Sequence, residues 1–360
     1  MRSVLWVLAA LMLSGCGDGD GTQAGGTYQD ADEVYRWKLI TTWPKNLPGL
    51  GMGPERLADR LRIMSNGRLD IRVYGAGELV GAFEVFDAVS AGTAEMGHGA
   101  AYYWRGKIPV AAMFSTVPFG MTAQEMNAWL HHGGGMALWR ELYEPFSLVP
   151  MAAGNSGMQM AGWFNKEINT IDDIRGLQMR IPGLGGEVLK RLGGEPVSMP
   201  GSDVYSSLQR GVIDAAEWVS PFNDLALGLQ DIAEYYYYPG WQEPGPTTEL
   251  IVNAQAWESL PEDLRMMVET TARMINEDML SEFTAQNGRA LATLRREHDV
   301  QLRRLPDDVL EKLKAASREV VAETAQGNPL AQRIHDSYMS FMAEVREYQA
   351  ISEQAYNDAR

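Results

Sequence analysis

The stretch that organises this chain runs from Gly154 to Glu243 and holds three key pieces: Gly-Asn-Ser-Gly-Met-Gln at residues 154–159, Gln-Met-Arg-Ile-Pro-Gly at 178–183 and Asp-Ala-Ala-Glu-Trp at 214–218. Arg180, in the second piece, ends a predicted strand just before a Pro-Gly break. A guanidinium there points out of a sheet edge into open space, where its planar fork matches both oxygens of a carboxylate. For an isolated arginine a surface salt bridge is the commoner role, but the neighbouring pieces favour carboxylate binding.

Part of this stretch repeats an earlier segment. Residues 84–95 and 203–214 share one order of residue types: an acid, Val, an aromatic, small or polar residues, an apolar residue, Gly and a closing acid. Two amphipathic helices with glycine stops can match by chance; a real repeat indicates two lobes of similar build that face each other. His98 and Gly99 then correspond to Glu217 and Trp218, at the mouth of a shared crevice where α/β sheets bind ligands.

Strand and helix patterns alternate before this stretch. The sequence predicts strands at 35–42, 69–74 and 94–99, and helices from Pro54 to Asn66 and at 83–91. Such β-α-β units build a largely parallel sheet covered by helices. A helical pattern at 123–143 is interrupted by Gly133-Gly134-Gly135.

Strands are predicted at 148–152, 158–164 and 250–253, and a short helix at 225–235. From about Pro261 a helical pattern continues without proline to His298, and further helices follow at 306–324 and from Pro329 to the end. A helix as long as the first of these must bridge two lobes or pack on another subunit.

The composition excludes several classes of protein. The 360 residues include 31 Lys and Arg against 47 Asp and Glu, a formal net charge of −16, and no Lys/Arg cluster interrupts this balance. Nucleic acid and anionic lipid are therefore not expected as partners, whereas an anionic ligand needs only one locally positive pocket. The hydrophobic content of 45%, with 10 Trp and 14 Tyr, excludes a disordered protein.

The N-terminus has the pattern of a bacterial lipoprotein leader. Residues 1–15 contain Arg2 and a short apolar run, and Leu-Ser-Gly-Cys at 13–16 resembles a lipobox in which Cys16 is lipidated and becomes the new N-terminus. Cys16 is the only cysteine, so no internal disulfide can form. Residues 16–33 read as a flexible tether. We expect a periplasmic protein held at the membrane only by this lipid; a plain secretory leader is the alternative.

Four motifs together resemble the solute-binding receptors of tripartite ATP-independent periplasmic (TRAP) transporters, and most closely the subgroup that binds 2-oxo or 2-hydroxy monocarboxylates with a metal cation. The motifs lie at residues 154–164, 179–188, 211–218 and 235–243, and the resemblance extends from about Tyr35 to the last helices. It implies an α/β, two-lobed periplasmic-binding-protein-like fold with a ligand cleft between the lobes and long C-terminal helices. The lobes would comprise 34–153 with 247–285, and 154–246, with 286–360 packing across lobes or subunits.

The resemblance also implies roles for particular residues. Arg180 matches the arginine that pairs with the ligand carboxylate, and a cation would be held by an amide, a carbonyl and carboxylates, an all-oxygen set that suits sodium first and calcium second. Each residue alone has a plainer reading, such as a cross-strand partner, a core Trp or a loop acid. The implied ligand-binding residues are Arg180, Gln159, Asn155, Tyr103 and Trp218, and the implied metal-binding residues are Gln159, Glu217, Trp218 and Glu243.

The leading functional hypothesis is a receptor, not an enzyme, that closes on a small organic acid and delivers it to TRAP membrane permease subunits. Two alternatives remain: an enzyme that uses Glu217 and Glu243 as a carboxylate pair, and a receptor that feeds a sensor kinase. No nucleophile with its base is evident in the sequence. The subgroup implies a homodimer, and pyruvate, lactate and longer 2-oxo acids share the head group that Arg180 would bind.

Overall fold

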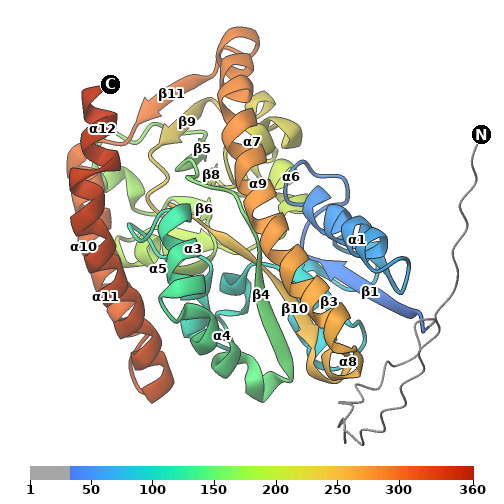
Figure 1. Cartoon of the computed structure of the whole chain (residues 1–360). Helices are drawn as coiled ribbons and strands as arrows, with labels where there is room; N and C mark the ends of the chain where they lie inside the picture. The colour runs from blue at the N-terminus through green and yellow to red at the C-terminus, as the bar shows by residue number, and fades with distance from the viewer. Residues whose placement is uncertain (1–32) are drawn as a thin grey trace, which may run out of the picture. The chain divides into compact units, whose positions relative to one another are not determined.

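Two β-sheets form the frame of residues 33–360, the part of the chain that the computed structural model describes (Figure 1). The expected signal peptide, Cys16 and all but the end of the tether lie outside the described residues. Each sheet has helices packed on it, which confirms the predicted α/β, two-lobed fold. No helix among residues 33–360 is long and apolar enough to cross a membrane.

The first lobe is built on a five-stranded sheet. In spatial order its strands are β2 (Leu69–Tyr74), β1 (Tyr35–Thr41), β3 (Met96–Gly99), β10 (Thr247–Asn253) and β4 (Leu148–Asn155). β1 runs parallel to β2 and β3, as the β-α-β pattern predicts, while β10 runs antiparallel to β3 and β4. The chain leaves this lobe after β4 and returns at β10, and Asn155 and Thr247 are register partners. These two crossings between the lobes therefore lie side by side.

The second lobe is built on a six-stranded sheet. In spatial order its strands are β11 (Gln301–Arg304), β9 (Tyr235–Tyr238), β5 (Gly162–Phe164), β8 (Ala215–Ala216), β6 (Gln178–Arg180) and β7 (Glu195–Val197). β6 is parallel to both β7 and β8, and Arg180 pairs in register with Ala216. Because the carboxyl ends of parallel strands share one edge of a sheet, this register brings Arg180 next to Glu217.

Helices cover both sheets. The α-helices are α1 (Met52–Met64), α2 (Val85–Ser90), α3 (Ala123–His132), α4 (Gly135–Tyr143), α5 (Gly183–Arg191), α6 (Gly201–Gln209), α7 (Pro221–Leu227), α8 (Ala254–Ser259), α9 (Glu262–Glu297), α10 (Asp307–Glu323), α11 (Pro329–Ile351) and α12 (Glu353–Ala359). The 3₁₀ helices are η1 (Ala82–Glu84), η2 (Ala101–Trp104), η3 (Pro109–Phe114), η4 (Glu144–Phe146), η5 (Ile171–Ile174) and η6 (Leu229–Asp231).

The long helix α9 spans both lobes. It packs on α1 and β4 of the first lobe and on α7, which follows β8 of the second (Figure 1). Leu264 and Ile275 on its first half and Phe283 and Leu294 on its second are all buried. The sequence left open whether this helix bridges the lobes or packs on another subunit, and the structure shows it bridging the lobes.

Two local predictions differ from the structure, and several short strands were not predicted. The helix expected at 225–235 instead begins at Pro221 and ends at Leu227, because Gly228 has a φ of +76° that glycine adopts without strain. The strand expected at 158–164 is shorter in the structure, where β5 begins at Gly162 and ends at Phe164. Strands β7, β9 and β11 were not predicted; the four residues of β11 carry no clear apolar alternation and are fixed by parallel pairing with β9.

Candidate ligand and cation site

Arg180 and Glu217 form a fully buried ion pair where the two lobes meet. Nη1 of Arg180 lies 3.0 Å from Oε2 of Glu217 and 2.8 Å from its carbonyl oxygen, and both side chains are at most 1% exposed. Nε donates to the carbonyl of Met199 at 3.3 Å, and Nη2 to the hydroxyl of Tyr103 at 3.4 Å. Four of the five guanidinium N–H groups thus have partners, which leaves one on Nη2.

The expectation that Arg180 points from a sheet edge into open space is wrong. Arg180 does end β6 at the carboxyl edge of the sheet, but its side chain is only 1% exposed. Tyr103, on η2 of the first lobe, covers the guanidinium from the opposite side. Burial of Arg180 therefore depends on contacts between the lobes, which the local pattern around residue 180 does not reveal.

The side chain of Trp218 is fixed by packing. Its ring lies 5.1 Å from Cζ of Arg180 and fits against Gly201, where a Cβ would come within 2.1 Å of the ring. Nε1 donates to Oδ1 of Asn223, whose Nδ2 donates to the carbonyl of Pro48 in the first lobe at 2.6 Å. Since the indole N–H is used in this way, the polar group that Trp218 can offer a cation is its backbone carbonyl.

Gln159 and Glu243 come from two loops that run side by side. The backbone N–H of Gln159 donates to the carbonyl of Glu243 at 3.2 Å, and a Cβ on Gly240 would lie 2.1 Å from the carbonyl oxygen of Gln159. This close approach explains the glycine in the Pro-Gly-Trp-Gln-Glu motif. Both side chains are buried, at 4% and 2% exposure.

Asn155 supports these loops from within. Its Oδ1 accepts from the backbone N–H of Gly157 at 2.8 Å, and its Nδ2 lies 3.2 Å from the carbonyl of Gly245 and 3.4 Å from Oγ1 of Thr247. These bonds hold the Gly-Asn-Ser-Gly turn against the start of β10. Asn155 does not line the cavity at this site, in contrast to Tyr103, Gln159 and Trp218.

The oxygens expected to hold a cation are buried and lack hydrogen bonds. Oε1 of Gln159, Oε1 of Glu217 and Oε2 of Glu243 are covered from solvent and accept nothing from residues 33–360. Leaving a buried polar atom without a partner costs about 1–3 kcal/mol, and more for a charged group. Oε1 of Gln242, the residue before Glu243, is also buried and has no hydrogen-bond partner within residues 33–360. Amide and carboxylate oxygens are the ligands of a hard cation such as sodium or calcium, so this donor set fits one.

No cluster of three or more His, Cys, Asp or Glu side chains that could hold a metal occurs within residues 33–360. The candidate set contains only two carboxylates, and therefore depends on an amide and a backbone carbonyl as well. Such a mixed set suits an oxygen-binding cation and not zinc.

The electrostatics of the site call for positive charge. Burial raises the pKa of the Glu217 carboxyl to about 7, with Arg180 opposing the shift and Asp224 adding to it. Burial and the charge of Glu217 raise the pKa of Glu243 well above its usual range, and Arg180 only partly offsets this. One guanidinium thus faces two buried carboxyls, and a bound cation would supply the charge that stabilises both as anions.

A small cavity adjoins these groups. The space that the centre of a water molecule can reach is about 20 Å³. Its walls come from both lobes and are mainly apolar or aromatic: Trp43, Leu50, Ala100, Tyr102, Tyr103, Ser115, Ser156, Gln159, Trp218, Val219, Pro246 and Thr248. Apart from Tyr103, the first-lobe wall was not predicted, because residues near positions 43, 100, 115 and 248 share no motif and meet only in the fold.

His98 orients one wall of this cavity. Nε1 of Trp43 donates to Nδ1 of His98 at 2.9 Å, and Nε2 of His98 lies 3.0 Å from the carbonyl of Ala153. Burial lowers the pKa of His98 to about 4, so the ring is neutral, accepts from Trp43 and donates to Ala153. His98, on β3, thus fixes Trp43 and does not itself line the cavity.

The profile of the bacterial extracellular solute-binding proteins of family 7, named DctP, matches residues 41–328. A monocarboxylate 2-oxoacid-binding periplasmic protein of Nostoc is 41% identical over 323 residues, which are 90% of this chain and 88% of that protein.

Two solved structures of TRAP periplasmic solute-binding proteins are also 41% identical, and each alignment covers 91% of this chain and 100% of the other. The one from Pseudoalteromonas atlantica, with bound sodium and pyruvate, superposes with a TM-score of 0.89. The one from Colwellia psychrerythraea, with bound calcium and pyruvate, superposes with a TM-score of 0.88. This chain therefore belongs to the DctP family of TRAP solute-binding proteins and is a solute receptor, not an enzyme.

Proposed function

We propose that this receptor binds a small 2-oxo or 2-hydroxy monocarboxylate between its lobes, together with one metal cation, and delivers it to a TRAP permease. The observation that carries the proposal is the set of three unpartnered oxygens, on Gln159, Glu217 and Glu243, beside the buried Arg180. The similarity to receptors with bound pyruvate supports the same choice of ligand.

Arg180 and Tyr103 are the groups suited to the ligand carboxylate. Arg180 has one N–H left on Nη2, and the Tyr103 hydroxyl, which accepts from that nitrogen, keeps its own proton to donate. Burial raises the pKa of Tyr103, so its hydroxyl stays protonated at neutral pH. We infer that the two donors bind the carboxylate together, one from each lobe, so that the ligand holds the lobes closed.

A cation held by Gln159, Glu217, Glu243 and the carbonyl of Trp218 would attract a carboxylate oxygen and the 2-oxo or 2-hydroxy oxygen of the ligand. The net charge of the site helps to decide which cation it would bind. With a ligand carboxylate present, the site holds three negative charges and one positive charge. Calcium balances them, whereas sodium leaves one negative charge that a proton on Glu243 would remove.

The walls of the cavity favour a short ligand. Leu50, Ala100 and Val219 line it with apolar surface, and the ring of Trp43 is held in place by His98. A bulky side chain on the ligand would have to displace these groups from a closely packed interior. We therefore propose pyruvate, or an acid of similar size, as the preferred ligand.

Three further proposals concern membrane anchoring, dimerisation and recognition by the permease. The Leu-Ser-Gly-Cys pattern supports lipidation at Cys16 and membrane anchoring by that lipid alone.

Tyr348, Ile351 and Tyr356, on α11 and α12, are between 65% and 78% exposed and would be covered in a homodimer that pairs these helices. Closure of the lobes supplies the signal by which a permease would recognise the loaded form.

A thermal-unfolding assay on cation-stripped protein tests the proposed ligand and cation together. Pyruvate alone should leave the melting temperature nearly unchanged, whereas pyruvate with sodium or calcium should raise it. Ligand at about 100 times its Kd stabilises the folded state by about 2.7 kcal/mol. Propionate, which lacks the 2-oxo oxygen, is the control and should stabilise less. A shift with pyruvate that is equal with and without cations would refute cation-assisted binding.

A further inference from the structure

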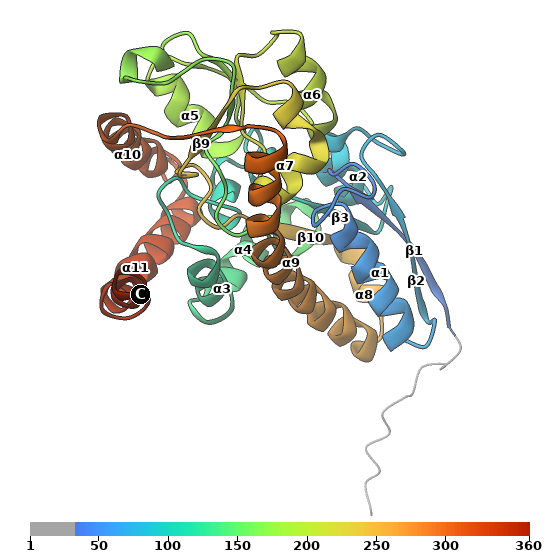
Figure 2. The same ribbon diagram turned by 90° about the horizontal axis from the view of Figure 1, so that it is seen from above.

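A second pocket lies between α10, α11 and the loop at 117–120. The ribbons of α10 and α11 overlap in Figure 1 but stand apart when seen from above in Figure 2, and residues of both helices line the pocket. The pocket measures about 220 Å³ by the same water-centre measure. It is lined by Val117, Pro118, Phe119, Gly120, Lys314, Ser317, Arg318, Val321, His335, Met339, Met342 and Arg346. None of these residues lines the cavity beside Arg180.

The interior of this pocket is apolar. Val117, Val321 and Met342 are buried, and Met339 is half-buried. The one hydroxyl on the α10 wall, that of Ser317, donates to the carbonyl of Leu313 at 2.7 Å and is therefore already satisfied. Surfaces of this kind bind the hydrocarbon part of a small ligand.

The polar residues that line the pocket are all basic, apart from Ser317. Lys314 and Arg318 on α10 form no ion pair with any residue of 33–360. Arg346 on α11 donates to the carbonyls of Phe119 and Gly120 at 2.7 and 3.1 Å. His335 lies 3.1 Å from Asp336, and no acidic side chain lines the pocket. In a chain of net charge −16, such a concentration of unpaired positive charge calls for an anionic partner.

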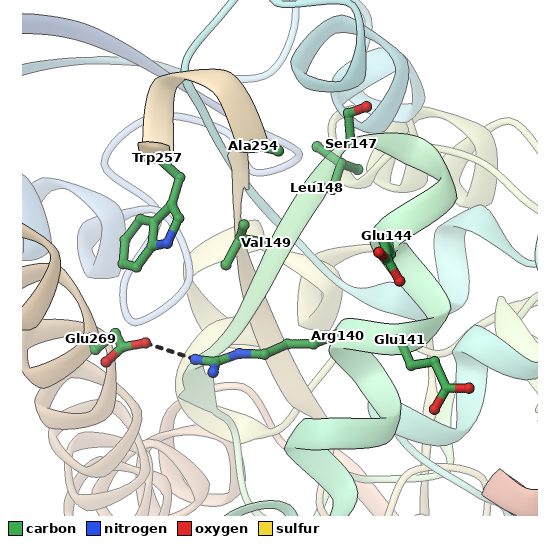
Figure 3. Close-up of a pocket in the computed structure, with 9 residues that line it drawn as sticks. All are labelled: Arg140, Glu141, Glu144, Ser147, Leu148, Val149, Ala254, Trp257 and Glu269. Carbon is green, nitrogen blue, oxygen red and sulfur yellow. Dashed lines mark hydrogen bonds and ion pairs between the residues drawn. The ribbon is translucent and has the colours of Figure 1, made fainter. Parts of the chain in front are cut away.

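A third pocket provides the contrast (Figure 3). This pocket of about 370 Å³ lies between α4, β4, α8 and α9, and the residues that line it include Arg140, Glu141, Glu144 and Glu269. Arg140 pairs with Glu269 at 2.7 Å, and Glu141 pairs with Arg333 at 2.7 Å. Its charges are mixed and mostly satisfied by partners within the protein, unlike those of the pocket beside α10.

We propose that the pocket between α10 and α11 is a second binding site, for a small organic anion that carries one carboxylate on an apolar tail. The tail would lie against Val321, Met339 and Met342, and Lys314 and Arg318 would bind the carboxylate at the rim. A medium-chain fatty acid has this chemistry, whereas an acidic peptide would leave the apolar interior uncovered.

The second site contacts the loop that carries Glu243. The backbone N–H of Phe119 donates to the carbonyl of Trp241 at 2.8 Å, and the two rings lie 6.0 Å apart. An anion in the pocket would therefore rest on a segment bonded to the candidate cation loop. The two sites have to be separated in any test.

The test is calorimetric titration of octanoate into the full-length protein saturated with sodium and pyruvate, and into the Arg180→Ala variant without pyruvate. We expect octanoate to bind both, because the second site does not use Arg180. Octanol and acetate, which supply the tail or the charge alone, should bind much more weakly. Failure of octanoate to bind either protein overturns the proposal and leaves the pyruvate site unaffected.

Reversing the charge of one lysine at the rim of the pocket tests whether octanoate binds there. Lys314→Glu should weaken octanoate binding by about tenfold, since the new carboxylate repels the ligand at close range. Lys312→Glu makes the same change of charge on an exposed position of α10 that does not line the pocket, about 200° away around the helix, and should change affinity by less than about twofold. Equal losses in the two variants would contradict the assignment.

Discussion

Replacing Arg180 with Ala should weaken the binding of pyruvate by about 2–5 kcal/mol, since a buried carboxylate would lose its charged partner. The loss should be measured by calorimetry in the presence of a saturating cation. Arg180→Lys keeps the charge but loses the planar fork that contacts Glu217, Met199 and Tyr103 at once, so it should recover only part of the affinity.

The matched control is Arg175→Ala. Arg175 is exposed, and within residues 33–360 its ion-pair partner is Asp172 at 3.2 Å, so its loss should leave affinity unchanged. Removing Arg180 also removes the charge that opposes the raised pKa of Glu217, and that carboxyl should then take up a proton in the free protein. The melting temperature of the ligand-free variant shows whether the substitution destabilises the fold, separately from its effect on binding. A folded Arg180→Ala protein with wild-type affinity would rule out the proposed site.

Replacing Glu243 with Gln should change which cation supports binding. The substitution keeps an oxygen ligand and removes one negative charge, which leaves the site balanced with sodium but one positive charge in excess with calcium. Calcium-supported pyruvate binding should fall by at least about 2 kcal/mol, while sodium-supported binding should fall less or not at all. Parallel titrations with each cation measure the difference. Equal losses with both cations would show that Glu243 acts through its shape and not its charge.

The same variant should alter the pH dependence of binding. A cation displaces the protons of Glu217, whose pKa is about 7, and of Glu243, whose pKa is raised further. Calcium-supported affinity should therefore rise as the pH increases through 7 and above, because fewer protons compete with the cation. In Glu243→Gln the rise should be smaller, since only Glu217 still titrates.

The parts of the site that lie within the sequence motifs could be foreseen. Arg180 ends one strand of the second lobe and Glu217 follows the adjacent one, and parallel pairing of these strands brings the two predicted site residues together. The long helix α9 was evident from its uninterrupted helical pattern. The functional roles of Gln159 and Glu243 stay predictions, which their unpartnered oxygens support.

What the sequence could not supply are features that depend on distant segments. Arg180 is buried only because Tyr103 reaches it from the other lobe, and Trp43 becomes a cavity wall only because His98 accepts its indole N–H. The short strand β11 exists because the chain returns to β9 after α9. None of these contacts has a local periodicity or spacing that sequence patterns could reveal.

The most direct test is a crystal structure of the protein grown with pyruvate and calcium. The account predicts a calcium ion about 2.3–2.6 Å from Oε1 of Gln159, Oε1 of Glu217 and Oε2 of Glu243. It also predicts a pyruvate carboxylate hydrogen-bonded to Nη2 of Arg180 and the hydroxyl of Tyr103. A calcium ion located elsewhere, or pyruvate bound without contact to Arg180, would contradict the account.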